Sequence, residues 1–246
     1  MKFNEAQKQI ILGSLLGDAG INKDKRYEGY EFAERHSIRQ IDYLKWKNQY
    51  LNFNFKTYEK HNLCTIRKSN KIFKEYKKLF YKGFTKVITK EILNKVNSLG
   101  LAVWYLDDGD YVYKSNYIRL ATHNFKLEGN EIIKKWFEEK WNISPKIRKT
   151  YDQRWQKEYF YLEFNNLNGK KLLNLIKEHV TKSMEYKIGL DEEKRKRAKE
   201  KKQEYNKRWW ENNENKRVAY YQKWKKLNYQ QYLKNKRKPI KNYLYG

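Results

Sequence analysis

Hydrophobic and polar positions along the chain predict two similar series of helices and strands. The runs "ILGSLLGDAGI", which starts at Ile11, and "LAVWYLDDGDY", which starts at Leu101, are both typical of apolar helices that end in an aspartate followed by a small residue. When Asp18 is aligned with Asp108, 90 residues later, the segments that follow the two aspartates also correspond. This internal repeat predicts two related halves within one chain.

The segments after each aspartate predict the same order of elements. In the first half, strands are expected in 26–37, a helix in 38–51, a hairpin in 55–69 and a helix in 71–82. In the second half, strands are expected in 110–125, a helix in 130–141, a hairpin in 144–164 and a helix in 168–180. Alternating apolar and polar positions in 117–122 and 159–164 indicate strands with one buried face.

The expected fold is therefore α/β, of the α+β type. Two pseudo-symmetric αββαββα halves, residues 1–97 and 98–189, would each carry an antiparallel sheet with helices on one face. The open faces of the sheets would present lysine, arginine, glutamine, asparagine and tyrosine side chains, which suit a DNA groove.

Residues 190–246 have a different composition and predict a basic helical extension. They contain 19 lysines and arginines, 7 acidic residues, many aromatic residues and few aliphatic ones. "YNKRW", from Tyr205 to Trp209, recurs as "YYQKW", from Tyr220 to Trp224, and residues four apart share a helix face. We expect short basic helices with an aromatic stripe that includes Trp210. A segment with so few aliphatic residues cannot bury enough apolar surface to fold well alone. The extension should therefore dock on the core or fold on nucleic acid.

The charge of the chain restricts its partners. The 246 residues carry a formal net charge of +27, and 17% of them are aromatic. Such an excess is usually neutralised by a polyanion, and nucleic acid is the first candidate. A membrane surface is the alternative, but it is not expected, because the basic residues lie on every segment and not beside one amphipathic helix. No apolar run approaches the roughly 20 residues of a membrane span. Cys64, the single cysteine, excludes an internal disulfide framework and a multi-cysteine zinc site. We expect a soluble intracellular protein, in a phage-infected or bacterial cytoplasm or an organelle matrix.

Two glycines explain how the paired aspartates can meet. Gly13 and Gly17 lie on one helix face and permit close contact with the second apolar helix, which would bring Asp18 and Asp108 together. Acids at helix C-termini are unfavourable, because the helix dipole and the second acid both repel them. A divalent cation bound between the acids makes their proximity favourable. Carboxylates, helix-end carbonyls, water and a phosphate together form an oxygen site suited to Mg²⁺, so the pair predicts a nuclease.

The two motifs resemble the signature motifs of the LAGLIDADG homing endonucleases, in the single-chain form with two pseudo-symmetric halves. The resemblance covers roughly residues 4–190. It implies that Asp18 and Asp108 bind the metal, and that Gly17 and Asp107 offer mainly their backbone carbonyls. We expect Mg²⁺ as the cofactor, with Mn²⁺ as a possible substitute.

The resemblance also implies one basic residue in each half that orders the solvent around the attacking water. "FTKVITKEIL" matches the lysine-rich stretch of the first half and nominates Lys86. "TKSMEYKIG" matches the corresponding stretch of the second half and nominates Lys187. Both lysines are therefore candidate catalytic residues.

The leading hypothesis is a monomeric, site-specific double-strand DNA endonuclease, encoded by an intron or free-standing. The resemblance implies that both strands are cut across the minor groove, leaving short 3′ extensions. The two sheets would read a long, pseudo-asymmetric target through base edges in the major groove. The candidate DNA contacts are basic residues of the expected strands, hairpins and extension: Arg26, Arg35, Lys56, Arg67, Lys114, Arg119, Lys146, Arg148, Arg154, Arg208 and Lys223.

Two other functions use the same scaffold. The first is an RNA-binding maturase that helps its own intron to splice, with or without DNA cleavage. The second is a sequence-specific repressor. A lost metal-binding acid would favour either of them over an active nuclease. Because both acids are present, the sequence favours cleavage while leaving a second, maturase activity open.

Overall fold

The computed structural model describes residues 2–24, 29–154, 156–229 and 233. The chain divides into two compact units, Met1–Arg195 and Lys196–Gly246. The first unit contains both halves of the sequence repeat.

The first half begins with a helix and builds a four-stranded sheet. Its elements are α1 (Glu5–Leu16), β1 (Gly20–Asp24), β2 (Gly29–Ser37), α2 (Ile41–Leu51), β3 (Asn54–Tyr58), β4 (Leu63–Asn70) and α3 (Phe73–Phe80). The strands are antiparallel in the order β1-β2-β4-β3. The prediction that 26–37 holds a strand pair was wrong, because β1 starts at Gly20. β1 has only one apolar residue, Ile21, so it forms through its pairing with β2, which no local pattern predicts.

The second half repeats this order. Its elements are α5 (Ser98–Asp108), β7 (Gly109–Val112), β8 (Tyr117–Leu120), α6 (Lys126–Trp141), β9 (Lys146–Asp152), β10 (Lys157–Phe164) and α7 (Asn166–Ile176). The antiparallel sheet has the equivalent order β7-β8-β10-β9. The predicted αββαββα repeat is therefore confirmed. A small hairpin, β5 (Tyr81–Lys82) and β6 (Thr85–Lys86), and α4 (Lys90–Asn94) join the halves.

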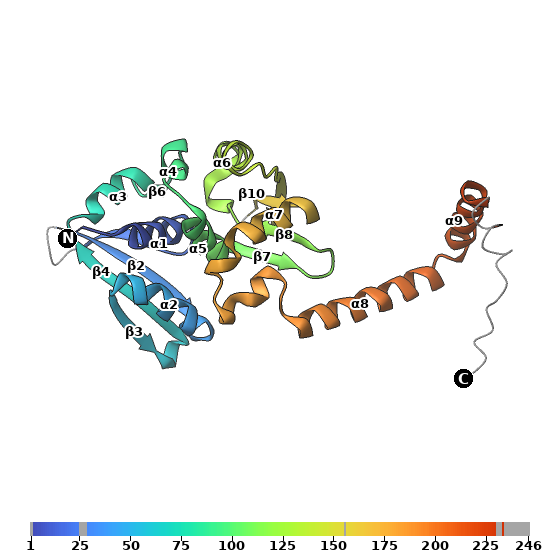
Figure 1. The fold of residues 1–246 in the computed structure, drawn as a ribbon, viewed down its shortest axis with the longest axis horizontal. Coiled ribbons are helices and arrows are strands. Elements are labelled where there is room, and N and C mark those ends of the chain that lie inside the picture. Colours follow the sequence, from blue (N-terminus) through green and yellow to red (C-terminus); the bar gives the residue numbers. More distant parts are fainter. Residues whose placement is uncertain (1, 25–28, 155, 230–232, 234–246) are drawn as a thin grey trace, which may run out of the picture. The chain divides into compact units, whose positions relative to one another are not determined.

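The two repeats meet where α1 packs against α5, between the sheets (Figure 1). A Cβ atom on Gly13 would collide with the carbonyl oxygen of Gly100 and lie 2.7 Å from Cβ of Val103. A Cβ atom on Gly17 would lie 2.5 Å from Cβ of Asp107. The predicted role of Gly13 and Gly17 in close helix contact is thus confirmed, since any side chain there would push the helices apart.

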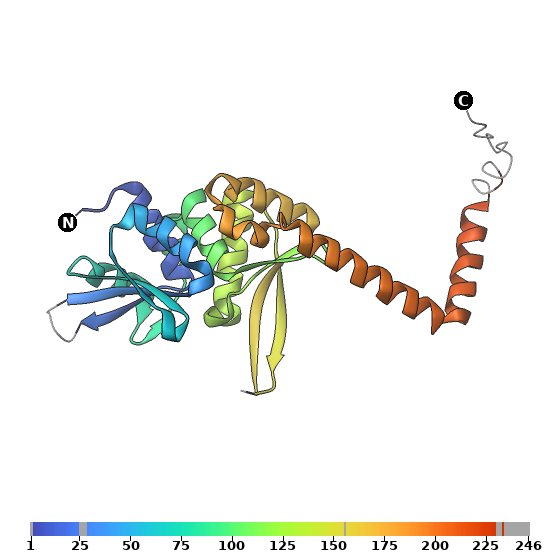
Figure 2. The same cartoon turned by 90° about the horizontal axis from the view of Figure 1, so that it is seen from below.

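Helices cover one face of each sheet and leave the other open. α3 packs on β2 and α2 on β4, while α6 packs on β9 and β10 and α7 on β8. The inward positions are apolar and buried, as Ile118 and Leu120 on β8 and Leu162 and Phe164 on β10 show. The hairpin of β9 and β10, yellow in Figure 2, extends well away from the helices. The open faces and this hairpin are therefore available to a large ligand.

The basic extension consists of α8 (Glu192–Glu211) and α9 (Glu214–Leu227). α8 has 20 residues and is not the short helix that the sequence predicted. The helix is rich in both basic and acidic residues, and i,i+4 ion pairs such as Arg208–Glu204 support a long polar helix. No residue of α8, all of whose positions are described, is buried. Aromatic rings meet around the turn to α9, where Trp210 lies 4.8 Å from Trp209 and 6.0 Å from Tyr220. Within the described part of the chain, no helix combines the length and apolar character needed to cross a membrane.

Candidate active site

The two aspartates of the motifs lie at the paired ends of α1 and α5. α1 ends at Leu16, with Gly17 as its cap, so that Asp18 follows directly, and α5 ends at Asp108. The absence of a side chain on Gly17 leaves room for the Asp107 carboxylate. The structure therefore brings Asp18 and Asp108 together, and the charge of each acts on the same neighbours.

The electrostatics of the two acids differ. Burial raises the pKa of Asp108 to about 7, and the charges of Asp107 and Asp18 add to this effect. The Asp18 side chain, by contrast, is 42% exposed. The acids at this junction repel one another, and a bound cation would reduce that repulsion.

A lysine approaches each helix end in an equivalent way. Lys86 Nζ donates a hydrogen bond to the carbonyl oxygen of Gly17 at 2.9 Å. Lys187 Nζ donates to the carbonyl oxygen of Asp107 at 2.7 Å. These carbonyls belong to the residues that precede Asp18 and Asp108. The four nominated catalytic residues thus lie together, two from each half.

Local contacts hold both lysines in place. β6 pairs with β5 through Tyr81 opposite Lys86, and the Tyr81 hydroxyl accepts a hydrogen bond from the backbone of Ile21 at 3.2 Å. Lys187 lies in a 3₁₀ segment, Lys182–Ile188, where its own carbonyl accepts from the Tyr105 hydroxyl at 2.6 Å. Burial lowers the pKa of both lysines, although the nearby aspartates oppose this shift. Both ammonium groups therefore face the acids with little solvent between them.

The oxygen atoms at the helix ends fit a hard divalent cation. Asp18, His36 and Asp107 each offer an atom within 4.8 Å of one another. The Asp107 carboxylate, however, is already bonded to Lys47 and Tyr43. The donors left for a cation are the carboxylates of the two motif acids and the carbonyls that precede them. Each carbonyl has a second lone pair beside its lysine contact. An all-oxygen set of this kind suits Mg²⁺.

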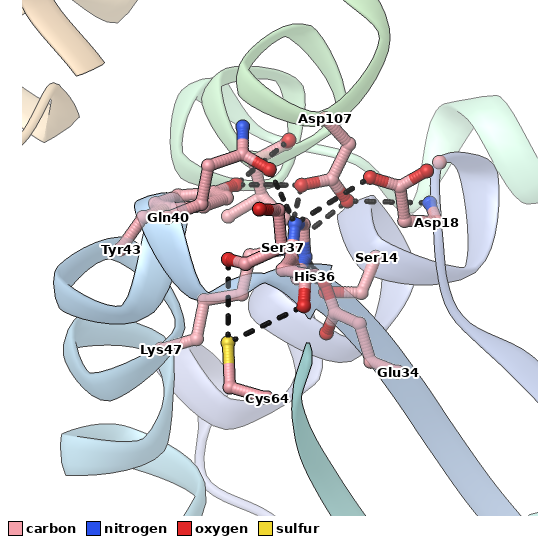
Figure 3. Close-up of polar contacts among 12 residues, drawn as sticks. Ser14, Asp18, Glu34, His36, Ser37, Gln40, Tyr43, Lys47, Cys64 and Asp107 are labelled. Carbon is pink, nitrogen blue, oxygen red and sulfur yellow. Dashed lines mark hydrogen bonds and ion pairs between the residues drawn. The ribbon is translucent and has the colours of Figure 1, made fainter. Parts of the chain in front are cut away.

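Sequence analysis missed a charged cluster behind the acids, drawn in Figure 3. Glu34 and His36 lie on the inward face of β2, and Lys47 lies on the inward face of α2; all three side chains are buried. Tyr43 joins them from α2. The sequence contained a signal for these residues. Glu34 and His36 follow buried Phe32 at every second position, so they share its face of β2, and Lys47 occupies a buried position in the helical pattern of α2.

Two hollows on the open sheet faces are lined by candidate DNA contacts, and one of them also reaches Asp108. One, of about 470 Å³, is lined by Asp108, Asp110, Arg119, Ala121, His123, Thr150 and Tyr161. Another, of about 350 Å³, lies on the first sheet and is lined by Glu31, Asn54, Lys56, Tyr58, Thr65, Arg67, Lys68 and Ser69. The first hollow places Asp108 at the edge of an open sheet face.

Most candidate DNA contacts are exposed. The exposed ones are Arg35, Lys56, Lys114, Arg119, Lys146, Arg148, Arg154, Arg208 and Lys223. Arg67 is half-buried, and Arg26 lies outside the described residues.

Four of these arginines pair with acids of the same surface, Arg67 with Glu31, Arg119 with Asp110, Arg148 with Glu163 and Arg154 with Asp152. Surface pairs of this kind contribute only about 0–1 kcal/mol, so a phosphate can replace the acid.

The sequence of the chain is similar to those of known proteins. The chain is 26% identical over 203 residues to a protein named RecA from Mycolicibacterium flavescens, covering 76% of this chain and 47% of that protein. It is 27% identical over 201 residues to cytochrome b mRNA maturase bI2 from Saccharomyces cerevisiae, covering 73% of this chain and 46% of the maturase. The chain thus spans about half the length of these relatives.

The fold is similar to that of the homing endonuclease I-WcaI bound to its DNA recognition sequence. The TM-score is 0.63 at 21% identity, over 76% of this chain and 88% of that one. A model of the LAGLIDADG DNA endonuclease family matches residues 8–172, which include both motifs, both sheets and the Lys86 hairpin. The chain therefore belongs to the LAGLIDADG DNA endonuclease family.

Proposed function

We propose that this protein is a site-specific double-strand DNA endonuclease that hydrolyses phosphodiesters with Mg²⁺ and leaves short 3′ extensions. One observation carries the proposal: each half supplies an aspartate at a shared helix junction and a lysine bonded to the carbonyl before it. A duplex has two strands to cut, and the site has two matching sets of groups.

The residues of the site have separate roles. The carboxylates of Asp18 and Asp108, with the carbonyls of Gly17 and Asp107, would hold the cation. When bound, Mg²⁺ supplies charge to the phosphate and lowers the pKa of a bound water. Lys86 and Lys187 fix the two carbonyls and bring positive charge to the place where a phosphate approaches. Because the two lysines have near-equivalent positions, each half has one basic group that would order the solvent around its attacking water.

Binding rests on surfaces outside this junction. The open sheet faces would read base edges in the major groove, while exposed basic residues neutralise phosphates. We propose the ten described arginines and lysines named above as contacts, with Arg208 and Lys223 of the extension lengthening the bound segment. A monomer suffices because both halves lie in one chain. Such a protein acts inside the cell, in a cytoplasm or organelle matrix that holds its target DNA.

Asparagine substitutions of the two acids test the activity. A target is first recovered by selecting cleaved sites from a randomised DNA library with Mg²⁺. Asp18→Asn and Asp108→Asn should each reduce cleavage of that target by about 10³-fold or more, as removal of a metal ligand does. DNA affinity should change little, because it rests on many phosphate contacts. Single-turnover cleavage and filter binding measure the two quantities.

The control is Asp42→Asn, which changes an exposed aspartate in the first turn of α2. It should cut normally. Cleavage should also stop, with binding retained, when Ca²⁺ replaces Mg²⁺, because calcium accepts looser geometry. Near-normal cutting by both motif variants would remove the active-site assignment, and blunt or 5′-extended products would contradict the proposed chemistry.

A maturase activity is the second candidate, because one relative is named cytochrome b mRNA maturase bI2. Here the protein would bind the RNA of its own intron through the same basic surfaces. If it assists splicing, Asp18→Asn should abolish DNA cleavage and leave splicing of that intron RNA unchanged. Equal affinity for the intron RNA and for an unrelated RNA of equal length would argue against this role.

A further inference from the structure

A fully buried lysine lies behind the two acids. Lys47 Nζ donates hydrogen bonds to Asp107 Oδ1 at 2.7 Å, Asp107 Oδ2 at 3.0 Å and Ser14 Oγ at 3.1 Å. It also contacts Glu34 Oε1. The side chains of Lys47, Glu34 and Asp107 that form these ion pairs are all 0% exposed. A lysine with two carboxylates therefore sits in the core at the end of α1 and α5.

This cluster reaches Asp18 through two routes. Asp107 Oδ2 accepts a hydrogen bond from the backbone N–H of Asp18 at 3.4 Å. His36 contacts Glu34 Oε1 through Nε2 at 2.8 Å, while its Nδ1 lies 3.8 Å from Asp18 Oδ2 (Figure 3). Nδ1 also lies 3.2 Å from Gln40 Oε1. Both ring nitrogens of His36 therefore face acceptors, which fits a charged imidazolium.

Among the described residues, the corresponding sheet and helix positions of the second half hold no such cluster. β1 pairs Gly20, two residues after Asp18, with Ala33, and β7 pairs Asp110, two residues after Asp108, with Arg119. The strand positions of Glu34 and His36 thus correspond to Leu120 and Thr122. The buried residues of α6, a helix described throughout, are uncharged: Gly129, Asn130, Ile133, Trp136 and Phe137. The positions of β8 and α6 that correspond to this cluster therefore bury uncharged side chains.

Core stability does not explain this difference. Burying a lysine and two carboxylates costs desolvation energy that well-packed apolar residues avoid, and replacing such groups by apolar ones is often neutral or stabilising. The second half shows that this chain can fill the corresponding positions with uncharged side chains, since Thr122 and Asn130 bond to each other there. Buried charges retained beside a reacting site more often serve the site than the core.

We propose that Lys47 is a positioning residue that fixes the Asp18 half of the metal site, so that cleavage of one DNA strand depends on it more than cleavage of the other. The proposal rests on the proposed endonuclease function. Lys47 holds the Asp107 carboxylate through both oxygens and so keeps it packed against Gly17, the residue before Asp18. In that orientation Oδ2 receives the Asp18 N–H and holds the turn after α1. Asp108 is held separately, since its carbonyl accepts the N–H of Ala121 at 3.0 Å.

Two variants test the proposal. Lys47→Met removes the ammonium but strands both carboxylates, which threatens folding. The double variant Lys47→Met with Glu34→Gln leaves one carboxylate, Asp107, still bonded to Tyr43. The control is Lys140→Met, on the equivalent helix α6, which removes a lysine bonded to the Val96 carbonyl far from the acids. Thermal unfolding selects the variants that are folded.

Cleavage of a supercoiled plasmid bearing the recovered target is then followed strand by strand across Mg²⁺ concentrations. We expect the folded variants to accumulate nicked plasmid, with one strand slowed about 10-fold or more relative to the other. The half-saturating Mg²⁺ concentration should rise by a similar factor, since groups that orient ligands typically contribute about 10–100-fold to metal affinity or activity. Calorimetric titration of the protein–DNA complex with Ca²⁺ should show weakened binding, independently of cleavage.

Equal slowing of both strands, with unchanged Mg²⁺ half-saturation and Ca²⁺ affinity, would overturn the positioning role and make Lys47 a structural residue. That result requires a parent protein that cuts both strands. A parent that cuts no target at all counts against the proposed function instead, so the two failures are distinguishable.

Discussion

At the scale of single residues, Lys86 and Lys187 provide a test of how the two halves share the chemistry. Lys86→Met and Lys187→Met should each slow cleavage by about 10²-fold or more, because each removes a positive charge and a hydrogen bond beside the reacting phosphate. DNA affinity should fall far less. Single-turnover rates and binding constants separate these effects. The exposed Lys90→Met, which loses only a surface pair with Glu139, is the control. A variant that lost affinity but kept its rate would show that its lysine contacts the DNA backbone.

The raised pKa of Asp108 predicts that divalent metal binding depends on pH. In the metal-free protein this carboxyl, with a pKa of about 7, is mostly protonated at pH 6 and mostly ionised at pH 8. A cation must displace the proton, so affinity should rise as the pH rises and protons should be released on binding. Calorimetric Ca²⁺ titrations of the DNA complex at pH 6 and pH 8 measure both effects. Asp108→Asn should abolish them, and equal affinities at the two pH values would contradict this ionisation.

The same carboxyl affects folding stability with a defined sign. Its folded pKa lies above its unfolded value of about 4, so the folded protein binds more protons between pH 4 and pH 7. The contribution of Asp108 to stability is therefore present below pH 4 and lost as the pH rises to 7. A bound divalent cation offsets the loss.

The sequence located the two motif acids but not the buried residues that contact them. Asp18 and Asp108 could be placed at helix ends because an apolar helical run stops at each of them. Lys47 falls on the apolar face of α2, but that pattern alone does not identify its partners, Glu34 and Asp107, which come from other segments. Contacts across such sequence distances leave only weak local patterns.

At the scale of elements, periodicity predicted what one segment can decide. The helix α6 and the hairpin of β9 and β10 each carry the apolar pattern of their own structure, and the sequence placed both in the right segments. The strand β1 has no such pattern, because this polar segment forms a strand only through its pairing with β2. The 20-residue length of α8 was also missed, because its helical support comes from i,i+4 ion pairs and not from an apolar stripe. The internal repeat predicted the αββαββα order of elements even where single segments were misjudged, because the same order of elements appears twice in the sequence.

At the scale of the whole molecule, the question is what the second unit adds to the first. Residues 196–246 hold 17 basic and 4 acidic residues, a net charge of +13. Their described helices expose Tyr205, Tyr220, Tyr221 and Trp224. Basic residues beside exposed aromatic rings are suited to nucleic acid, and each neutralised phosphate adds about 0.9 to the salt slope of binding. The extension should therefore raise affinity without taking part in the reaction.

Truncation after Arg195, where the compact units divide, tests this role. The shortened protein should remain folded and cut at the same bonds, with weaker binding, a flatter salt dependence and a footprint shortened on one side. A full-length variant with Lys199, Lys202 and Lys207 changed to glutamine should show a smaller change in the same direction. The matched control changes three exposed lysines of the helical side of the first unit: Lys78 on α3, Lys135 on α6 and Lys95 directly after α4. If the tail variant and the control have the same salt slope as the parent, the extension does not contact DNA. If the truncated protein fails to unfold cooperatively, the aromatic helices are instead part of the folded core, because only lost packing removes a cooperative transition.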